Sequence, residues 1–328
     1  MKIGILTQPL GHNYGGIFQN YALQQTLLQL GHDPLTIDLQ PEEPLRDYII
    51  SCVKSFKPRP RRSYSRPELT GEFIRKNIRM SRPVSRCSAS ILEEYGIDAL
   101  LVGSDQVWRP KYNAGVLDDM FLSFARNVEC PKASYAASFG TSDLSEYSPA
   151  EICRCRRLLA HFDAVSVRED SAVELCRGYF SRDASLVLDP TLLLERSDYE
   201  ALCRDIPKSE APFAAFYCLD DSSEKLDKAR KIAKDKSLEL RQFTSGGGLS
   251  LTPQQWLSTL RDASLVITDS YHGRIFAGIF GKPVHSLGSV SRGNDRFQTL
   301  DRLMGEPSEF ENCRRNSLDF LRRWLNCR

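Results

Sequence analysis

The residues best suited to chemistry lie within seven positions, from Thr268 to Arg274. The imidazole of His272 can transfer protons near neutral pH, and the guanidinium of Arg274 can bind a carboxylate or a phosphate. Ser270 precedes a helical pattern, and the free N–H groups of a helix start suit an anion. We interpret this stretch as an anion site. The alternative is that Asp269 or Ser270 only caps the helix and His272 packs beneath it.

The flanking sequence predicts the elements that position these side chains. An apolar run at 265–268 precedes them, and large apolar residues recur at helical spacing over 275–280 before Gly281 and Pro283. This pattern predicts a strand, a tight turn and a helix. Polar groups at the carboxyl end of such a strand occupy the usual ligand position of α/β proteins.

A second candidate is Arg168, which follows a predicted strand at 162–167 and precedes a predicted helix. A guanidinium at this place suits a carboxylate or a phosphate. The alternative is a surface salt bridge with Glu169 or Asp170.

Small and polar residues also follow a predicted strand at 98–102. Asp105 and Gln106 belong to this turn, and the Asp105 carboxylate could accept hydrogen bonds from sugar hydroxyls. The position at a strand end again predicts a binding site.

The chain opens with a predicted strand at 2–6, followed by a loop that contains Asn13, Tyr14, Gly15 and Gly16 and then by a helix. The loop lacks the dinucleotide spacing Gly-x-Gly-x-x-Gly and the phosphate-loop Gly-Lys-Ser/Thr, so nicotinamide and nucleoside triphosphate cofactors are poorly supported. Gly15 and Gly16 would let the backbone approach a sugar or an anion closely. A tight turn without a ligand is the alternative.

Length and composition bound the remaining possibilities. The 328 residues favour two domains, and the formal net charge of +2 argues against nucleic-acid binding by the chain as a whole. The N-terminus is predicted to be a strand rather than a signal peptide, and no apolar run approaches the ~18 residues of a membrane span. The ten cysteines lack the paired spacing of zinc sites. We therefore expect a cytoplasmic protein with reduced thiols and no metal.

The stretch from Lys57 to Arg86 contains ten Lys and Arg residues but only two Glu. Most such runs are solvated faces. The alternative is attraction to an anionic ligand or to a membrane surface.

We predict an α/β protein with two Rossmann-like domains whose mainly parallel sheets face a cleft. The N-terminal domain covers residues 1–160, with a basic insertion at about 41–90, and the C-terminal domain covers 161–308. Residues 309–328 form a helix that packs back on the first domain. Since candidate groups come from strand ends in both halves, we expect the site in the cleft between them.

Five segments in order resemble the polysaccharide pyruvyl transferase family over nearly the full chain. They are residues 13–16 with 19–23, 103–108, 166–169, 189–191 and 269–273. The resemblance implies a fold like that of B-type glycosyltransferases. It also implies transfer of pyruvate from phosphoenolpyruvate to a sugar as a cyclic ketal, without a further cofactor.

The resemblance also implies roles for particular residues. In this family the donor lies against the second domain and the acceptor against the first. Arg168 resembles a donor-binding arginine, and His272 resembles the histidine of the donor site. Ser270 stands where some members have an arginine, whose charge Arg274 or Arg296 would replace. The acceptor side would comprise Asn13, Tyr14, Gly15, Gly16, Asn20 and Gln106.

As a mechanism, we expect His272 to transfer a proton or contact phosphate, and Asp105 to orient or deprotonate an acceptor hydroxyl. Arg168 would bind the carboxylate or the phosphate of the donor. The sequence does not specify the sugar, which could be free or lipid-linked. An association of the protein with the inner face of the membrane is also possible. Two rival functions are a B-type glycosyltransferase that uses a nucleotide sugar and a non-catalytic sugar- or anion-binding protein.

Overall fold

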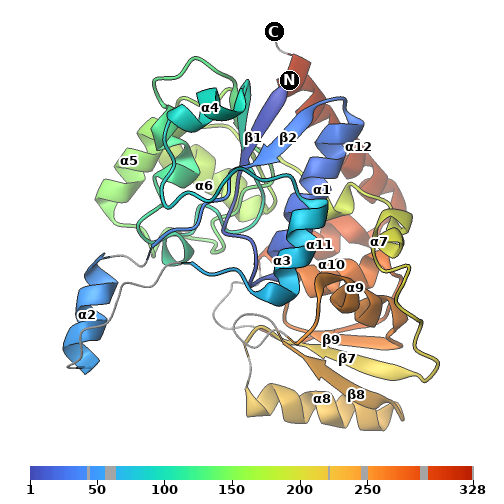
Figure 1. Cartoon of the computed structure of the whole chain (residues 1–328). Coiled ribbons are helices and arrows are strands. Elements are labelled where there is room, and N and C mark those ends of the chain that lie inside the picture. Colours follow the sequence, from blue (N-terminus) through green and yellow to red (C-terminus); the bar gives the residue numbers. More distant parts are fainter. Residues whose placement is uncertain (43–44, 56–63, 221, 245–249, 289–294, 327–328) are drawn as a thin grey trace.

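A computed structural model describes residues 1–42, 45–55, 64–220, 222–244, 250–288 and 295–326. It confirms the predicted α/β class, with two four-stranded parallel sheets and a short two-stranded pair (Figure 1). The strands are β1 (Lys2–Leu6), β2 (Asp33–Thr36), β3 (Ala99–Val102), β4 (Lys132–Ser134), β5 (Ser166–Val167), β6 (Ser185–Leu186), β7 (Phe213–Tyr217), β8 (Glu239–Phe243), β9 (Leu265–Thr268) and β10 (Val284–Ser286).

The helices cover the faces and edges of these sheets. They are α1 (Tyr14–Gln29), α2 (Leu45–Ser55), α3 (Glu68–Asn77), α4 (Ser90–Tyr95), α5 (Pro149–Leu159), α6 (Asp170–Phe180), α7 (Arg196–Leu202), α8 (Ser223–Asp235), α9 (Pro253–Asp262), α10 (Tyr271–Ile279), α11 (Asp295–Gly305) and α12 (Pro307–Asn326). Short 3₁₀ helices η1 (Pro110–Tyr112), η2 (Asp119–Phe121), η3 (Ser123–Ala125) and η4 (Pro190–Leu192) occupy connections.

The first sheet has the strand order β2-β1-β3-β4, and all its pairs are parallel. Its central strands are continuous apolar runs, such as Ala-Leu-Leu-Val in β3, whose residues are all buried. A parallel sheet covered on both faces needs this pattern. The carboxyl ends of the strands therefore share one edge.

The short pair β5-β6 extends this first sheet. Isolated bridges join Ala133 to Ala164 and Ala137 to Val167, beside the β5-β6 pairing. The predicted boundary at residue 160 therefore falls inside the first sheet, and the second sheet begins only at β7. The sequence missed this because α5 separates β4 from β5 just as a helix separates any two neighbouring parallel strands.

The second sheet has the order β10-β9-β7-β8. Alternate residues of β7 enter different cores: Phe213, Ala215 and Tyr217 pack with α9 and α10, whereas Ala214 and Phe216 pack with α8. This two-residue period is that of a strand buried on both faces. Figure 1 shows α8 and α9 on opposite faces of the sheet.

Helix α1 joins the two halves and is buried around most of its circumference. The Tyr14 and Phe18 rings stack on Trp256 of α9, with centroids 5.4 and 5.6 Å away. Helix α12 packs beside the first sheet: Phe320 and Leu321 share a core cluster with β1 and α1. Figure 1 shows both chain termini at the same end of the molecule.

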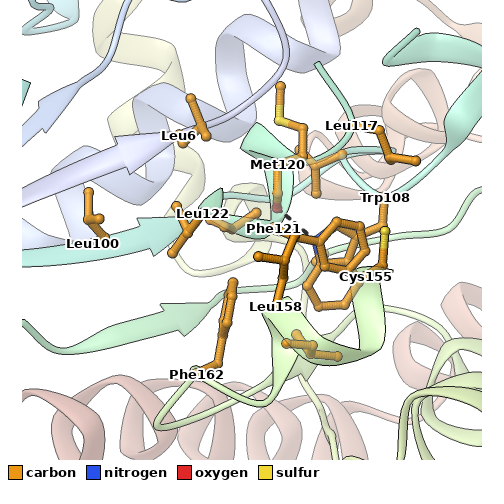
Figure 2. Packing of buried hydrophobic residues seen from close by; sticks show 14 of the residues in the cluster. Leu6, Leu100, Trp108, Leu117, Met120, Phe121, Leu122, Cys155, Leu158 and Phe162 are labelled. Carbon is orange, nitrogen blue, oxygen red and sulfur yellow. Dashed lines mark hydrogen bonds between the residues drawn. The ribbon is translucent and has the colours of Figure 1, made fainter. Parts of the chain in front are cut away.

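The loop after β3 is held by a separate apolar cluster. Trp108 is fully buried, stacks on Phe121, and donates from Nε1 to the carbonyl of Met120 at 3.0 Å. Figure 2 shows these side chains packed together with Leu122 and Leu158. This packing fixes the polar turn that precedes Trp108.

The described part of the basic stretch is largely integrated into the fold. Arg66 pairs with Asp38 at 2.7 Å and donates to the carbonyl of Leu10 at 3.0 Å. Arg79 pairs with Asp33, and Arg82 pairs with Glu94 at 2.8 Å. The basic residues between 57 and 62 lie outside the described residues. Among the helices that the structure describes, none is long and apolar enough to cross a bilayer.

Candidate functional site

Four strand ends and one helix start place polar side chains in a single group. Asp105 follows β3, Arg168 follows β5, Asp189 follows β6, and His272 lies in the first turn of α10 after β9. Asn13 caps α1 on the facing side. The parallel topology puts the carboxyl ends of β3, β5 and β6 at one edge, which explains why these side chains meet.

The guanidinium of Arg168 lies at the centre of this group. Nη1 contacts Asp189 Oδ2 at 2.8 Å, and Nη2 donates to Asp105 Oδ1 at 3.1 Å. Nε lies 3.6 Å from Glu169 Oε2, and the guanidinium carbon lies 4.5 Å from the ring centroid of Tyr271. Burial disfavours the charge, but the carboxylates and Tyr271 outweigh it and raise the pKa of Arg168 above its ordinary value.

Asp189 is the acceptor that Arg168 and His272 share. Its Oδ2 accepts from Ser104 Oγ at 3.0 Å and lies 3.5 Å from His272 Nε2. Its Oδ1 accepts from the N–H and the hydroxyl of Thr191 at 3.1 and 2.7 Å. Burial opposes ionisation, yet His272 and Arg168 hold the pKa of Asp189 well below its usual range. Asp189 is therefore a carboxylate, and it lies at ion-pair distance from the imidazole.

The His272 ring reaches from α10 to residues beside the first sheet and to α1. Nε2 faces Asp189, whereas Nδ1 faces Gly15 of α1, where a Cβ would overlap the ring. Since a carboxylate can only accept, a neutral His272 in this place carries its proton on Nε2 and leaves Nδ1 as the acceptor. Nδ1 is thus the ring atom directed toward α1.

On that facing side, Asn13 connects α1 to Asp105. Its Oδ1 accepts from the N–H of Gly15 at 3.0 Å, and its Nδ2 donates to Asp105 Oδ2 at 3.3 Å. A Cβ at Gly16 would lie 3.7 Å from Asp105 Oδ2, so Gly16 also borders this carboxylate. The loop of Asn13 and the turn of Asp105 therefore form one unit.

Asp105 has a left-handed backbone conformation, with φ at +76°. Few residues other than glycine adopt this conformation, although Asp and Asn do so more readily than most. Its carbonyl accepts from the N–H groups of Val107 and Ser138 at 2.8 and 3.1 Å, which fixes the turn. The conformation directs the carboxylate between Arg168 and Asn13.

Ser270 and Arg274, two other predicted donor residues, make local contacts around α10. Ser270 caps α10, its Oγ accepting from the N–H of Gly273 at 3.2 Å. Arg274 pairs with Asp301 and donates to Ser286 Oγ at 3.0 Å. Arg296 lies in α11, but its side chain is outside the described residues. None of these contacts joins Ser270 or Arg274 to the carboxylate group in the part of the chain described.

Asp269 has a structural role in this turn. Its carboxylate is fully buried, accepts from the N–H groups of Leu219 and Asp220 at 2.7 and 3.1 Å, and pairs with Lys225 at 2.6 Å. These bonds tie the end of β7 to the end of β9. Of the alternative considered above, the cap of α10 is Ser270, whereas Asp269 joins two strand ends and His272 faces Asp189.

Three predicted acceptor residues make internal contacts. The Tyr14 hydroxyl donates to the carbonyl of Leu251 at 2.6 Å, and burial raises its pKa to about 12. Asn20 accepts from Thr36 Oγ1 at 2.8 Å, and Gln106 Oε1 accepts from Arg109 at 2.9 Å. All three are buried. These contacts give Tyr14, Asn20 and Gln106 roles in holding the fold, and a sugar contact for them stays a prediction.

Sequence reasoning assigned no role to Asp189 and considered Glu169 only as a salt-bridge partner of Arg168, although both belong to segments used for the family resemblance. Glu169 accepts from the Ser138 hydroxyl and is buried. The available signal was an acidic residue directly after a short apolar run, Leu186 to Leu188 before Asp189. That signal is the same one that identified Asp105.

The group is closed in this structure. Arg168, Asp105 and His272 are 1%, 4% and 5% exposed, and His272 packs directly on α1. Three carboxylates face one guanidinium and one imidazole, so the group is rich in negative charge. Among the residues that the structure describes, no cluster of His, Cys, Asp or Glu is arranged to hold a metal ion.

Comparisons with known proteins bear on both fold and family. The structure is similar to UDP-GlcNAc 2-epimerase from Neisseria meningitidis bound to UDP-GlcNAc, with a TM-score of 0.55 and 11% identity over 100% of both chains. UDP-N-acetylglucosamine 2-epimerase from Rickettsia bellii gives a TM-score of 0.53 and 12% identity over 99% of this chain and 96% of that chain. These identities show the two-sheet fold alone. The family model for polysaccharide pyruvyl transferase matches residues 13–291, and no curated protein sequence matches the chain.

Proposed function

The chain belongs to the polysaccharide pyruvyl transferase family, and from this premise we propose that it transfers pyruvate from phosphoenolpyruvate to two hydroxyls of a sugar. The product would be a cyclic ketal on a precursor of a surface or capsular polysaccharide, made in the cytoplasm. No further cofactor is needed for this reaction.

The observation that supports this proposal most strongly is the meeting of Arg168 and His272 at one carboxylate, Asp189. Asn13 and Asp105 lie beside them, joined to each other and to Arg168. The group contains a proton-transfer residue, a guanidinium and acceptor carboxylates, drawn from segments far apart in the chain. A structural salt bridge would not require an imidazole at the same oxygen.

The atoms of the proposed reaction balance as follows. A proton adds to the methylene carbon of phosphoenolpyruvate, and a sugar hydroxyl attacks C2 while it loses its own proton. The C–O bond to phosphate breaks, phosphate leaves, and a second hydroxyl adds to C2 and loses a proton to close the ketal. Each step requires either a proton transfer or the stabilisation of the positive charge that develops at C2.

We assign proton transfer to His272, with Asp189 as its positioning residue. Nε2 lies 3.5 Å from Asp189, so we assign the proton exchange to Nδ1, on the side of Gly15. A correctly placed acid or base of this kind contributes about 10²–10⁴ in rate. Asp105, held by Asn13 and Arg168, would orient or deprotonate an acceptor hydroxyl.

The donor role of Arg168 needs an exchange of partners. Its guanidinium is fully buried and already bound to carboxylates. Phosphoenolpyruvate carries a carboxylate and a phosphate, and either group matches the geometry that a side-chain carboxylate occupies now. We propose that the donor replaces one of these carboxylates when α10 moves away from α1, and that Arg274 or Arg296 contributes further positive charge.

The direct experiment is to incubate the full chain with phosphoenolpyruvate and a panel of galactosides, mannosides and amino sugars, and to measure released phosphate and ketal. We expect phosphate release that depends on the sugar. A second arm replaces phosphoenolpyruvate by nucleotide sugars. Turnover in that arm alone would support the glycosyltransferase alternative, and turnover in neither arm, without stabilisation by phosphoenolpyruvate, would support the non-catalytic one.

A further inference from the structure

Helix α2 presents an unusual apolar face to solvent. Ile49, Ile50 and Val53 are 51%, 41% and 65% exposed. Their spacing of one and four residues places them on one side of the helix. They make up three of the eight large apolar residues that are exposed among the described side chains. Figure 1 shows α2 standing away from the rest of the molecule.

The sequence around this helix is strongly basic. Residues 45–86 contain twelve Lys and Arg side chains and three Asp and Glu, whereas the whole chain is nearly balanced at 44 and 42. Arg66, Arg79 and Arg82 are paired within the fold. Lys54, adjacent to Val53, is exposed, as are Arg75 and Lys76 at the end of α3. Lys54 thus places positive charge next to the apolar face, and further basic residues follow in the sequence.

We propose that α2 is an interfacial helix that docks this protein on an anionic lipid bilayer. An apolar face of a few large side chains beside basic residues is the composition of helices that lie in the headgroup region. The negative surface potential of an anionic leaflet attracts basic segments next to such a helix. Ile49, Ile50 and Val53 would enter the interface, and Lys54 would stay at the headgroups.

A second copy of the chain fits this face less well. Three side chains expose far less area than the roughly 1,200 Å² that a stable protein interface buries. Two copies meeting at α2 would also bring two basic segments together, which like charges oppose. A bilayer avoids both difficulties because it supplies an extended apolar layer and negative charge. This inference does not depend on the reaction proposed above.

The test is co-sedimentation of the full chain with vesicles of phosphatidylcholine alone and with vesicles that also contain phosphatidylglycerol. We expect much tighter binding to the anionic vesicles than to vesicles of phosphatidylcholine alone. The triple variant Ile49→Ser, Ile50→Ser, Val53→Ser should bind at least about tenfold more weakly, since the apolar contribution is lost. The matched controls Leu28→Ser in α1 and Tyr179→Ser in α6 remove exposed apolar side chains elsewhere and should bind like the wild type.

Two further readouts separate the outcomes. Raising the salt concentration should weaken binding of the wild type, because at 0.1 M salt charges more than about 10 Å apart are largely screened. Binding should not be abolished, because the apolar contacts persist. Circular dichroism and melting temperature should be unchanged in the triple variant. Absence of wild-type binding to anionic vesicles would overturn the proposal. So would equal binding by the triple variant, or a wild-type dimer in lipid-free buffer that the triple variant converts to a monomer.

Discussion

Gly15, in the first turn of α1, leaves the space that the ring of His272 occupies. A Cβ on Gly15 would overlap the Nδ1, Cγ and Cβ atoms of that ring, so no side chain fits here without displacing it. The contact joins the start of the first helix to the first turn of α10. Glycine is required here because any side chain would clash with the ring. The backbone conformation does not require it, since the φ angle of Gly15 is not in the left-handed region.

Gly15→Ala should therefore displace His272 and lower the rate of pyruvate transfer by about 10²-fold or more, because a misplaced acid or base loses most of its effect. In an exposed helix the same change normally stabilises by about 0.5–1 kcal/mol. Here we expect a lower melting temperature instead. Initial rates and thermal melts of the purified variant measure both effects.

The matched control is Gly178→Ala in α6, where the added Cβ meets no atom within 4 Å. It should keep full activity and a melting temperature equal to or above that of the wild type. Full activity in Gly15→Ala would show that His272 can move without consequence.

Asp189→Asn should lower kcat by about 10²-fold or more, because replacement of a carboxylate beside a histidine disturbs the tautomer of the histidine. The KM for phosphoenolpyruvate should change as well, since Asp189 also binds Arg168. A double-mutant cycle separates this role from a purely structural one. Asp189→Asn combined with His272→Ala should be no slower than His272→Ala alone, whereas additive losses would contradict the pairing.

Stability should depend on pH through the same carboxylate. Burial opposes ionisation of Asp189, but His272 and Arg168 hold its pKa below the usual value of about 3.9. The unfolded chain thus binds this proton more readily than the folded chain. The ionised Asp189 carboxylate contributes fully to the free energy of unfolding above about pH 4. This contribution is lost as the pH falls toward the lowered pKa of Asp189 in the folded state. Melting temperatures measured by calorimetry should decrease as the pH drops below about 4, and the decrease should be less steep in Asp189→Asn. Parallel curves would exclude Asp189 as the source.

Much of this site follows from the sequence. The predicted strand at 265–268 is β9, and Arg168 and Asp105 lie at the carboxyl ends of strands as expected. Polar residues that directly follow apolar runs were sufficient to predict these site positions, because the carboxyl ends of parallel strands lie at one edge of the sheet. That rule alone brings Asp105, Arg168 and Asp189 together.

The partners of Arg168 could not be predicted in the same way. The sequence offered Glu169 or Asp170 as partners, and Glu169 does lie 3.6 Å from Arg168. Asp170 instead pairs with Arg302, and the closer contacts of Arg168 are with Asp189 and Asp105. Those contacts depend on β5 and β6 joining the first sheet. The short strands carry no signal that specifies the sheet to which they belong.

The inward orientation of Tyr14 and Asn20 was also not predictable. Helix α1 is buried on nearly all sides, between the first sheet and α9 and α10. Hydrophobic periodicity therefore does not separate a ligand-facing side from a core-facing side. From the sequence alone, polar residues such as Asn20 are predicted to lie on the surface, and only the packing of both halves shows that they are buried.

Arg168→Lys should separate charge from geometry. Lysine keeps one positive charge but lacks the fork that reaches Asp105 and Asp189 together. We expect a large rise in the KM for phosphoenolpyruvate with a smaller loss of stability than in Arg168→Ala, where three buried carboxylates lose their partner at a cost of about 3–5 kcal/mol. Urea unfolding and steady-state kinetics measure the two effects.

The control is Arg302→Lys, which changes a half-exposed pair with Asp170. Exposed pairs contribute about 0–1 kcal/mol, so its stability and kinetics should match the wild type. An unaltered requirement for phosphoenolpyruvate in Arg168→Lys would remove Arg168 from donor binding.

The most direct test of the account is sugar-dependent phosphate release by His272→Ala, compared with the exposed control His161→Ala. The account predicts a loss of about 10²–10⁴-fold in turnover for His272→Ala with the fold retained, and normal turnover for His161→Ala. A folded His272→Ala protein that releases phosphate at the wild-type rate would contradict it.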